Sequence, residues 1–503
     1  MTLTRPGWLL IRALILVVGV QQVYLLWQFI SRCCPGPSRP VTLHPGRLFP
    51  ADPASRAIAR DLFAAIGHLP IVSPHGHTDP RWWGENPAFE NPAALFVMPD
   101  HCVCRMLVSQ GVPFAAPGIG PGAGTDPRTI WRTFAGHYHL FRATPSRLWV
   151  DHALETVFSM TTRLCADTAD AAHDAIAGQP GHPACRPRAL HDRFGIEVIA
   201  TTDPAIDDLR WHKAARDSGW TGRVVPTCRP DAVTDPDFEG FRANVETLAT
   251  PTGCDTGTWE GYLAAHRARR IFFRTMGATA TDHGHPTPLT DDLPGAGAAA
   301  LCQSVLSGRA TPGQRETFRA QMLTEFARMS VEDGLVMQLH PGSFRNHSAR
   351  VIATLGRDRG SDIPQPVSFT AALKPLLDAV GMDPRLTMIL FTLDETTCSR
   401  ELAPLAGACP SLRLGPPWWF HDSFEGIRRF RQMATETAGF LNTAGFNDDT
   451  RALCSIPARH DLSRRADCAF LADLVTTHRL DEDEAHHLAP LLANGLARAA
   501  CKL

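Results

Sequence analysis

The sequence lacks a strong charge of either sign, and it lacks a cysteine framework. Its 49 lysines and arginines nearly balance its 51 aspartates and glutamates, which leaves a formal net charge of −2. Without a basic excess, a nucleic-acid-binding surface is not expected. None of the 14 cysteines forms a CxxC pair, and a chain of 503 residues can build a core without disulfides. We therefore expect a globular protein with reduced cysteines and no nucleic-acid partner.

Residues 1–42 form an apolar extension followed by a turn-rich linker. Within it, residues 7–30 are mostly apolar and approach the ~20 residues that cross a bilayer, although Arg12 and two glutamines weaken the stretch as a span. Two interpretations stay open: a signal anchor or interfacial helix that contacts the membrane, or a non-native extension from an upstream start codon. We expect one folded domain over residues 43–503.

Eight short apolar runs follow, and helical patterns lie between them. This alternation predicts an α/β fold with a parallel sheet, and eight units suggest a closed barrel. Residues 85–190, between the first and second runs, show no strand-like alternation, so we expect a helical insertion there. The expected strands lie at residues 69–73, 196–202, 223–227, 271–273, 334–339, 386–391, 412–414 and 444–446.

The first run delivers two histidines, His75 and His77. In an extended backbone, side chains two residues apart project from the same face, and Gly76 lets the backbone come close. Two imidazoles at one point are a partial site for zinc, iron or nickel that needs a further ligand. A chain with 22 histidines also produces such a pair by chance, but the position at the end of a strand favours a metal site.

Further reactive side chains follow the other runs. In a (β/α)8 barrel the carboxyl ends of the strands share one face, which carries the active site. A chance scatter of polar residues would not favour one end of each strand. Together with the two histidines, the residues at these ends are Arg229, His340, Asp449 and Arg451.

Several motifs stand in a specific order along the chain. They are Pro-His-Gly-His-Thr-Asp-Pro around His75, Pro-Asp-His at His101, Arg-Pro-Asp at Arg229, Met-Gln-Leu-His at His340, Gly-Pro-Pro-Trp-Trp-Phe at Trp418 and Asp-Thr-Arg at Asp449. This order resembles the uronate isomerase (glucuronate isomerase) family of the amidohydrolase superfamily, over roughly residues 43–503. The resemblance implies a distorted (β/α)8 TIM-type barrel with a helical insertion after strand 1.

The resemblance also implies a reaction. Such enzymes interconvert D-glucuronate with D-fructuronate, and D-galacturonate with D-tagaturonate, through a cis-enediol. The family pattern has His75, His77 and Asp449 holding a divalent metal, usually zinc, and whether the reaction needs the metal is left open. Isomerisation requires a positioned acid/base and stabilisation of oxyanion charge, so we expect Asp449 and Arg451 to handle the proton.

The remaining implied roles concern the substrate. Arg229 would bind the sugar carboxylate with its planar fork, and His340 would lie close to metal and substrate as a catalytic residue. Arg345 either reaches the substrate hydroxyls or only fixes its loop. We expect His101, Trp418 and Trp419 to line the pocket. For the two tryptophans, the alternative is that they only pack in the core or at the rim of the barrel.

Cys102 departs from the family pattern, which has tyrosine after His101. A thiol is smaller than a phenol and has a pKa of about 8.5 rather than about 10, so it could still exchange a proton, from a shorter reach. We include Cys102 among the expected catalytic residues, and reduced activity stays open.

Two alternative functions remain. One is a metal-dependent hydrolase or deaminase of the same superfamily, disfavoured because the fourth strand has no lysine and the sixth ends at Asp394 without a histidine. The other is a degraded, membrane-attached protein that binds sugar acids. The family expectation is a cytoplasmic enzyme for a small hexuronate; a homo-oligomer is left open, and insertion of residues 7–30 would make the protein membrane-anchored.

Overall fold

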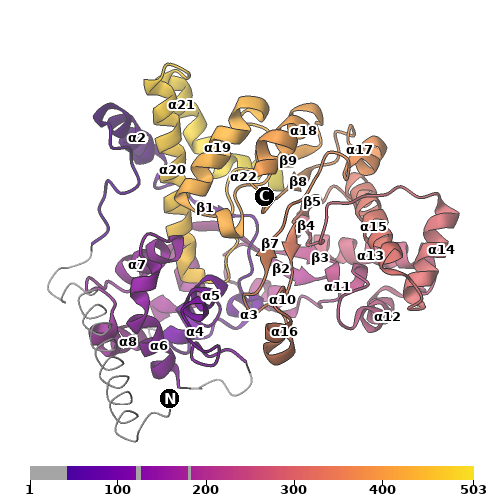
Figure 1. The fold of residues 1–503 in the computed structure, drawn as a ribbon, viewed down its shortest axis with the longest axis horizontal. Helices are drawn as coiled ribbons and strands as arrows, with labels where there is room; N and C mark the ends of the chain where they lie inside the picture. The colour runs from indigo at the N-terminus through magenta and orange to yellow at the C-terminus, as the bar shows by residue number, and fades with distance from the viewer. Residues whose placement is uncertain (1–41, 121–125, 179–182) are drawn as a thin grey trace, which may run out of the picture.

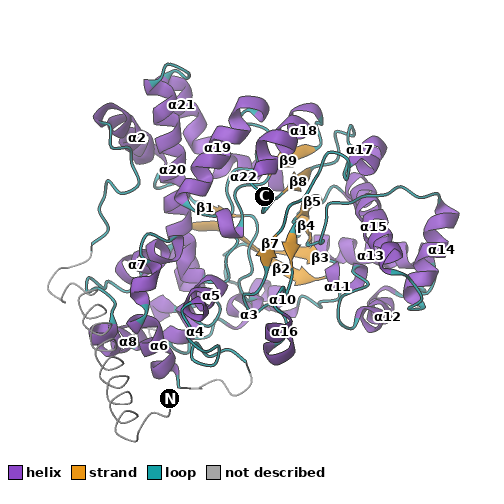
Figure 2. Ribbon diagram, in the orientation of Figure 1, coloured by secondary structure: helices purple, strands orange, loops and turns teal. Residues whose placement is uncertain are grey.

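A curled parallel sheet lies at the centre of the protein. The computed structural model describes residues 42–120, 126–178 and 183–503. In these ranges, consecutive strands lie side by side in the order β1-β2-β3-β4-β5-β8-β9, and helices surround them (Figure 2). The strands are β1 (Ile71–Ser73), β2 (Ile196–Pro204), β3 (Val224–Arg229), β4 (Ala280–His283), β5 (Val336–Leu339), β8 (Met388–Leu390) and β9 (Leu412–Leu414). The fold is a distorted TIM-type α/β barrel, as the sequence predicts.

The barrel closes without a regular eighth strand. After β9, one isolated parallel bridge joins Leu414 to Thr443, and the amide of Ala444 donates to the Leu414 carbonyl at 2.8 Å. The chain then returns to the β1 side, where the His77 amide donates to the Thr450 carbonyl at 2.9 Å. Within the described ranges, residues 444–446, where a strand was expected, therefore form no strand, and the only pairing beside them is the bridge at Thr443.

The strand expected at residues 271–273 is wrong. These residues lie in helix α13 (Trp259–Thr275), where Phe273 is buried and Ile271 is 57% exposed. The fourth strand is β4, whose four residues are all buried although three of them are polar. A search for apolar runs does not find this strand, because its buried polar side chains contribute to the site and not to the apolar core.

Some helices of the barrel begin and end at recognisable caps, and α15 (Pro312–Asp333) is the example that leads into a strand. Helix α15 begins after Thr311, which forms a capping box with Gln314, and ends at Gly334 with a positive φ of 78°. That sharp end turns the chain directly into β5. The outer helices are α2 (Pro53–Ile66), α10 (Arg210–Asp217), α11 (Asp231–Thr234), α12 (Phe241–Thr252), α13, α14 (Gly295–Leu306), α15 (Pro312–Asp333), α17 (Lys374–Val380), α18 (Ala403–Ala408), α19 (Phe424–Ala438), α20 (Ile456–Thr476), α21 (Glu482–Pro490) and α22 (Leu496–Cys501).

The segment between β1 and β2 is helical and has its own apolar cluster, which includes Trp131, Phe134 and Tyr138. It is drawn in purple in Figure 1. Its helices are α3 (Pro80–Glu85), α4 (Pro92–Phe96), α5 (His101–Ser109), α6 (Pro127–Gly136), α7 (Pro145–Thr156), α8 (Ala169–Ala177) and α9 (Pro187–Arg193).

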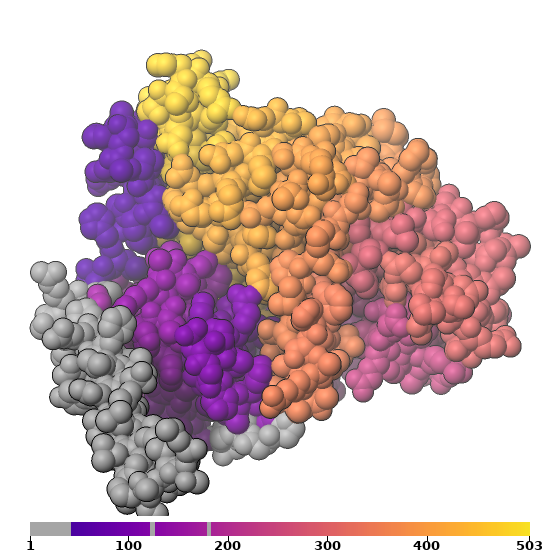
Figure 3. All heavy atoms as spheres, in the orientation of Figure 1, coloured from indigo at the N-terminus to yellow at the C-terminus, as the bar shows by residue number. Residues whose placement is uncertain are grey.

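A second segment reaches this insertion from the far side of the barrel. It contains β6 (Ser343–Phe344), α16 (Ala349–Leu355) and β7 (Ile363–Pro364). Figure 3 shows it in orange beside the purple insertion, and a Cβ on Gly120 would meet the Leu355 side chain.

No helix within the described ranges is both long and apolar enough to span a bilayer. Residues 7–30, for which membrane contact was considered, lie outside those ranges.

Candidate active site

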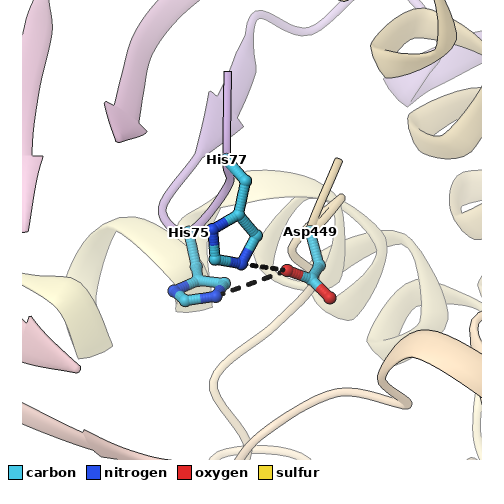
Figure 4. A group of neighbouring side chains, drawn as sticks. All are labelled: His75, His77 and Asp449. Atoms are coloured by element: carbon cyan, nitrogen blue, oxygen red, sulfur yellow. Dashed lines mark ion pairs between the residues drawn. The ribbon is translucent and has the colours of Figure 1, made fainter. Parts of the chain in front are cut away.

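Two histidines and one carboxylate from opposite ends of the chain meet at the carboxyl end of the barrel. The Nε2 atoms of His75 and His77 lie 3.4 Å and 3.3 Å from the same oxygen, Oδ1 of Asp449 (Figure 4). His75 is almost fully buried, whereas His77 is 24% exposed at its side chain. The family resemblance implies this meeting, and the structure brings the three residues together.

The three ligand atoms fit one small cation. Distances of 3.3–3.4 Å are long for direct hydrogen bonds. Two ligands bound to one tetrahedral ion at about 2.0–2.2 Å lie about 3.3–3.6 Å apart. Moreover, Oδ1 of Asp449 is buried without a hydrogen-bond partner among the described residues. His75, His77 and Asp449 therefore form a group that could hold a divalent metal ion.

Burial and charge set the protonation of this group. Burial lowers the pKa of His77 to about 4, so its imidazole is neutral at pH 7. Burial acts in the same direction on His75, but the carboxylates of Asp282 and Asp449 outweigh it and raise its pKa. Burial alone would raise the pKa of Asp449; the two histidines hold it well below its usual range. Asp449 is thus a carboxylate, as a metal ligand must be.

Asp449 has a strained backbone, and its neighbours hold it in place. Its φ is +38°, which a side chain other than glycine rarely adopts. Arg459 Nη1 donates to the Asp448 carbonyl at 2.9 Å, and His460 Nε2 lies 3.1 Å from the Asp448 carboxylate. Arg459 also pairs with the buried carboxylate of Asp422. These contacts fix the turn that carries Asp449.

A second polar network lies beside the first. Asp282, at the end of β4, accepts from His340 Nδ1 at 2.7 Å and pairs with Arg229 Nη1 at 3.0 Å. Arg229 Nε donates to Asp231 at 2.7 Å, so this guanidinium lies between two carboxylates. The His340 ring stacks on His75 at 4.6 Å. Burial lowers the pKa of His340, which favours its neutral form.

These groups face a cavity of about 940 Å³. It is lined by every residue for which the sequence analysis expects a role: His75, His77, His101, Cys102, Arg229, His340, Arg345, Trp418, Trp419, Asp449 and Arg451. Arg451 is exposed and forms no ion pair with a carboxylate in the described part of the chain. It is thus a cation available to an anionic ligand.

Another part of the cavity wall, next to His340, combines aromatic rings and a paired arginine. Trp418 packs edge-on against His340, with ring centroids 4.8 Å apart. The Arg345 guanidinium lies over Trp419 and 3.3 Å from Asp362, a contact that fixes its loop. Trp418 is buried and Trp419 is half-buried. Both tryptophans therefore line the cavity and also pack against the rim of the barrel.

Cys102 begins the wall formed by the insertion. Its amide donates to Asp100, the residue that caps α5, at 2.8 Å. Burial raises the pKa of its thiol to about 12, and the nearby Asp100 carboxylate adds to the rise. The thiol is therefore protonated at pH 7 and acts as a weak hydrogen-bond donor. Burial and the Arg451 charge lower the pKa of the neighbouring His101.

Sequence reasoning missed three polar residues that shape this site. The sequence predicts no role for Asp282 or for Arg459. Arg357 lines the cavity from the loop after α16 and lies over the Phe238 ring at 5.0 Å. A buried Asp within a run of small and polar residues was the available signal for Asp282, since an unpaired buried carboxylate is costly.

Comparisons with known proteins agree with this geometry. The family model for glucuronate isomerase matches residues 53–494. A uronate isomerase of Rhizobium meliloti is 59% identical over 465 residues, which cover 92% of this chain and 99% of that protein. A uronate isomerase of Mesorhizobium japonicum is 60% identical over 463 residues, or 91% and 99% of the two chains.

A solved structure agrees as well. The crystal structure of glucuronate isomerase from Caulobacter crescentus matches with a TM-score of 0.91 and 53% identity, covering 92% of this chain and 98% of that one. The matched residues include the barrel, the helical insertion and all the cavity residues discussed above. The chain therefore belongs to the glucuronate isomerase family.

Proposed function

We propose that the cavity interconverts D-glucuronate with D-fructuronate, and D-galacturonate with D-tagaturonate. The chain is an isomerase by its family. The observation that carries the substrate class is the meeting of His75, His77 and Asp449 in a cavity that also contains the guanidinium groups of Arg229 and Arg451. Charged donors for a carboxylate and for sugar oxygens thus surround one reaction centre.

The reaction needs no net oxidant. A proton leaves C2 of the open-chain aldose and returns to C1, while the hydroxyl proton on O2 passes to O1. In between, both carbons belong to a neutral cis-enediol, and negative charge develops on its oxygens while their protons are being exchanged. Asp449 and Arg451 are the pair that handles these protons. Oδ1 of Asp449 faces the two imidazoles, which leaves Oδ2 for the substrate.

The other residues bind and orient the sugar acid. Arg229 binds the carboxylate through the N–H groups that Asp231 and Asp282 leave free. His340 faces a sugar hydroxyl with Nε2, which is buried and has no hydrogen-bond partner among the described residues. His101, Trp418 and Trp419 exclude water from the reacting carbons, and Arg345 reaches a hydroxyl from its loop. Cys102 donates weakly from the position after His101.

A divalent metal fits the ligand set, and zinc is the proposed ion. When bound to His75, His77 and Asp449, it would polarise an oxygen of the substrate. A cytoplasmic, soluble enzyme is part of this proposal.

The test is a direct assay of the purified full chain. D-glucuronate and D-galacturonate are incubated in heavy water, and the products are followed by proton NMR. We expect each hexuronate to yield its ketose, with solvent deuterium at the carbon that accepts the proton. Failure to form ketose from either sugar acid would overturn the proposal, and hydrolysis or deamination of other substrates would favour the alternative.

Metal dependence is tested on the same preparation. We expect His77→Gln to lower the bound metal measured by mass spectrometry, because one of three ligands is lost. His266→Gln is the matched control, since His266 is buried on α13 and does not line the cavity. Equal metal content in wild type and His77→Gln would contradict the ligand assignment.

A further inference from the structure

Asp282 connects the two neighbouring strands of the barrel that carry proposed substrate residues. It lies at the end of β4, which is between β3 and β5 in the sheet. One carboxylate oxygen accepts from His340 Nδ1 at 2.7 Å, and the other lies 3.0 Å from Arg229 Nη1. Asp282 is fully buried, so water does not compete for these contacts.

The first contact fixes the hydrogen on the His340 ring. An ionised carboxylate only accepts hydrogen bonds, so Nδ1 of His340 must carry the hydrogen. In the neutral ring, Nε2 then has a free lone pair. The ring itself cannot turn easily, because it packs against two neighbouring rings, those of His75, at 4.6 Å, and Phe391, at 3.9 Å.

The second contact fixes the direction of the Arg229 guanidinium. Its Nε edge is held by Asp231 at 2.7 Å, and Nη1 is held by Asp282. Asp231 is itself fixed, because its carboxylate accepts from the Gly284 amide at 3.1 Å. A Cβ on Gly284 would lie 2.0 Å from Arg229 Nη2, so the guanidinium packs directly against this backbone. The remaining N–H groups of Arg229 are left for a ligand in the cavity.

We propose that Asp282 is a positioning residue for the isomerisation, one that holds His340 as its Nδ1–H tautomer and orients Arg229 toward the hexuronate carboxylate. His340 Nε2 then accepts a hydrogen bond from a sugar hydroxyl next to the reacting carbons. The inference rests on the proposed function for its substrate, but the tautomer of His340 does not depend on that substrate.

Asp282→Asn tests the proposal with almost no change in shape. The amide can present its oxygen to Arg229, so its NH₂ group must face Nδ1 of His340. The hydrogen of the ring then moves to Nε2, which can no longer accept from the sugar. We expect kcat to fall about 100-fold or more, as for loss of a positioned acid/base, with a smaller change in KM.

The tautomer is read directly from ring-nitrogen chemical shifts of isotope-labelled histidine, with His340 assigned by its loss in His340→Asn. We expect a hydrogen on Nδ1 in wild type and on Nε2 in Asp282→Asn. A wild-type His340 that carries its hydrogen on Nε2 would overturn the proposal, as would unchanged kcat in Asp282→Asn. If wild type converts no hexuronate, the proposed function fails, and the shifts alone still decide the tautomer.

Two further variants guard against a merely structural effect. Asp467→Asn is the matched control: Asp467 forms a buried pair with Arg431 at 2.7 Å outside the cavity, and its loss should leave kcat unchanged. His340→Asn keeps a donor toward Asp282 and removes Nε2, so it should lose as much activity as Asp282→Asn. In the double variant the losses should not multiply, because both act on one group. If the fold-losses of kcat multiply in the double variant, Asp282 does not act through His340. Normal turnover by His340→Asn would also contradict the proposal, even if Asp282→Asn did not fold.

Discussion

The two sides of the barrel hold their site residues by different means. On the side that carries β4 and β5, regular strand pairing continues to the site: Thr281 pairs with Met337 and Asp282 with Gln338. On the closing side, one bridge at Thr443 follows β9, and Asp449 lies in an irregular turn with a φ of +38°. On the first side the ladder fixes the backbone that carries the site residues, whereas on the closing side the backbone itself depends on side-chain contacts.

The site residues are thus held in position in two ways, by backbone hydrogen bonds on one side and by side-chain contacts on the other. A ladder of backbone hydrogen bonds fixes positions largely independently of the side chains it carries. A strained turn persists only where its surroundings over-determine it. We therefore expect that loss of a supporting side-chain contact on the closing side lowers kcat. Loss of a similar contact on the ladder side, away from the cavity, should leave kcat unchanged.

The largest effect should come from Asp449→Asn. Asparagine tolerates the positive φ at this turn, so the fold should survive. The variant loses the carboxylate that faces both imidazoles and, in our proposal, handles the substrate proton. We expect kcat to fall about 1,000-fold with D-glucuronate. Thermal unfolding should show an intact fold, and retention of most activity would exclude Asp449 from the proton transfer.

Arg459→Met should have the next largest effect, on stability and on activity together. The variant removes the donor to the Asp448 carbonyl and leaves Asp422 buried without its cation. Breaking a buried ion pair costs about 3 kcal/mol. We expect that loss in denaturant unfolding, with kcat at least about 10-fold lower because the turn at Asp449 loosens.

The pH dependence of that loss has a defined sign. Burial raises the pKa of Asp422 to about 7, against the lowering effect of Arg459, and the variant should raise it further. A group whose folded-state pKa is raised gives stability at low pH that is lost as pH rises through that pKa. Unfolding at pH 5 and pH 8 should therefore show a larger deficit at pH 8.

Arg431→Met is the matched control for this variant. Arg431 pairs with Asp467 between α19 and α20, and both side chains are buried. We expect a similar loss of stability, with kcat unchanged under conditions where the protein is folded. Equal loss of kcat in both variants would remove the distinction between the two kinds of support.

The sequence was informative where the ladder is regular. Strand-like runs predicted β1, β2, β3, β5, β8 and β9, and the side chains expected after the first, third and fifth runs lie at or just after the ends of β1, β3 and β5. It failed at β4, whose Thr281, Asp282 and His283 are polar, while the apolar run before it belongs to α13. It also overestimated the strand at residues 444–446, because apolar residues there pack without extended pairing.

The two histidines of the proposed metal site were predictable from the sequence, whereas the side-chain network around them was not. His75 and His77 are set by spacing in an extended chain, a local property. The contacts of Asp282 join three strands, and those of Arg459 reach from a helix to the turn at Asp449. Such contacts depend on the closed barrel, so no local pattern reveals them.

The smallest expected effect comes from two similar Thr→Val variants, one on each side of the barrel, each of which loses one buried hydroxyl contact. Thr450 Oγ1 lies 2.9 Å from Ser455 Oγ on the closing side, and Thr281 Oγ1 lies 3.0 Å from His283 Nε2 on the ladder side. Each hydroxyl is buried, so Thr450→Val and Thr281→Val should each cost about 1–2 kcal/mol in denaturant unfolding. Only Thr450→Val should also lower kcat, by a few-fold, because its hydroxyl supports the turn that carries Asp449 and Arg451. If Thr281→Val lowers kcat as much as Thr450→Val does, backbone pairing does not keep the site residues in place when a side-chain contact is lost. Both sides of the barrel would then respond alike to such a loss.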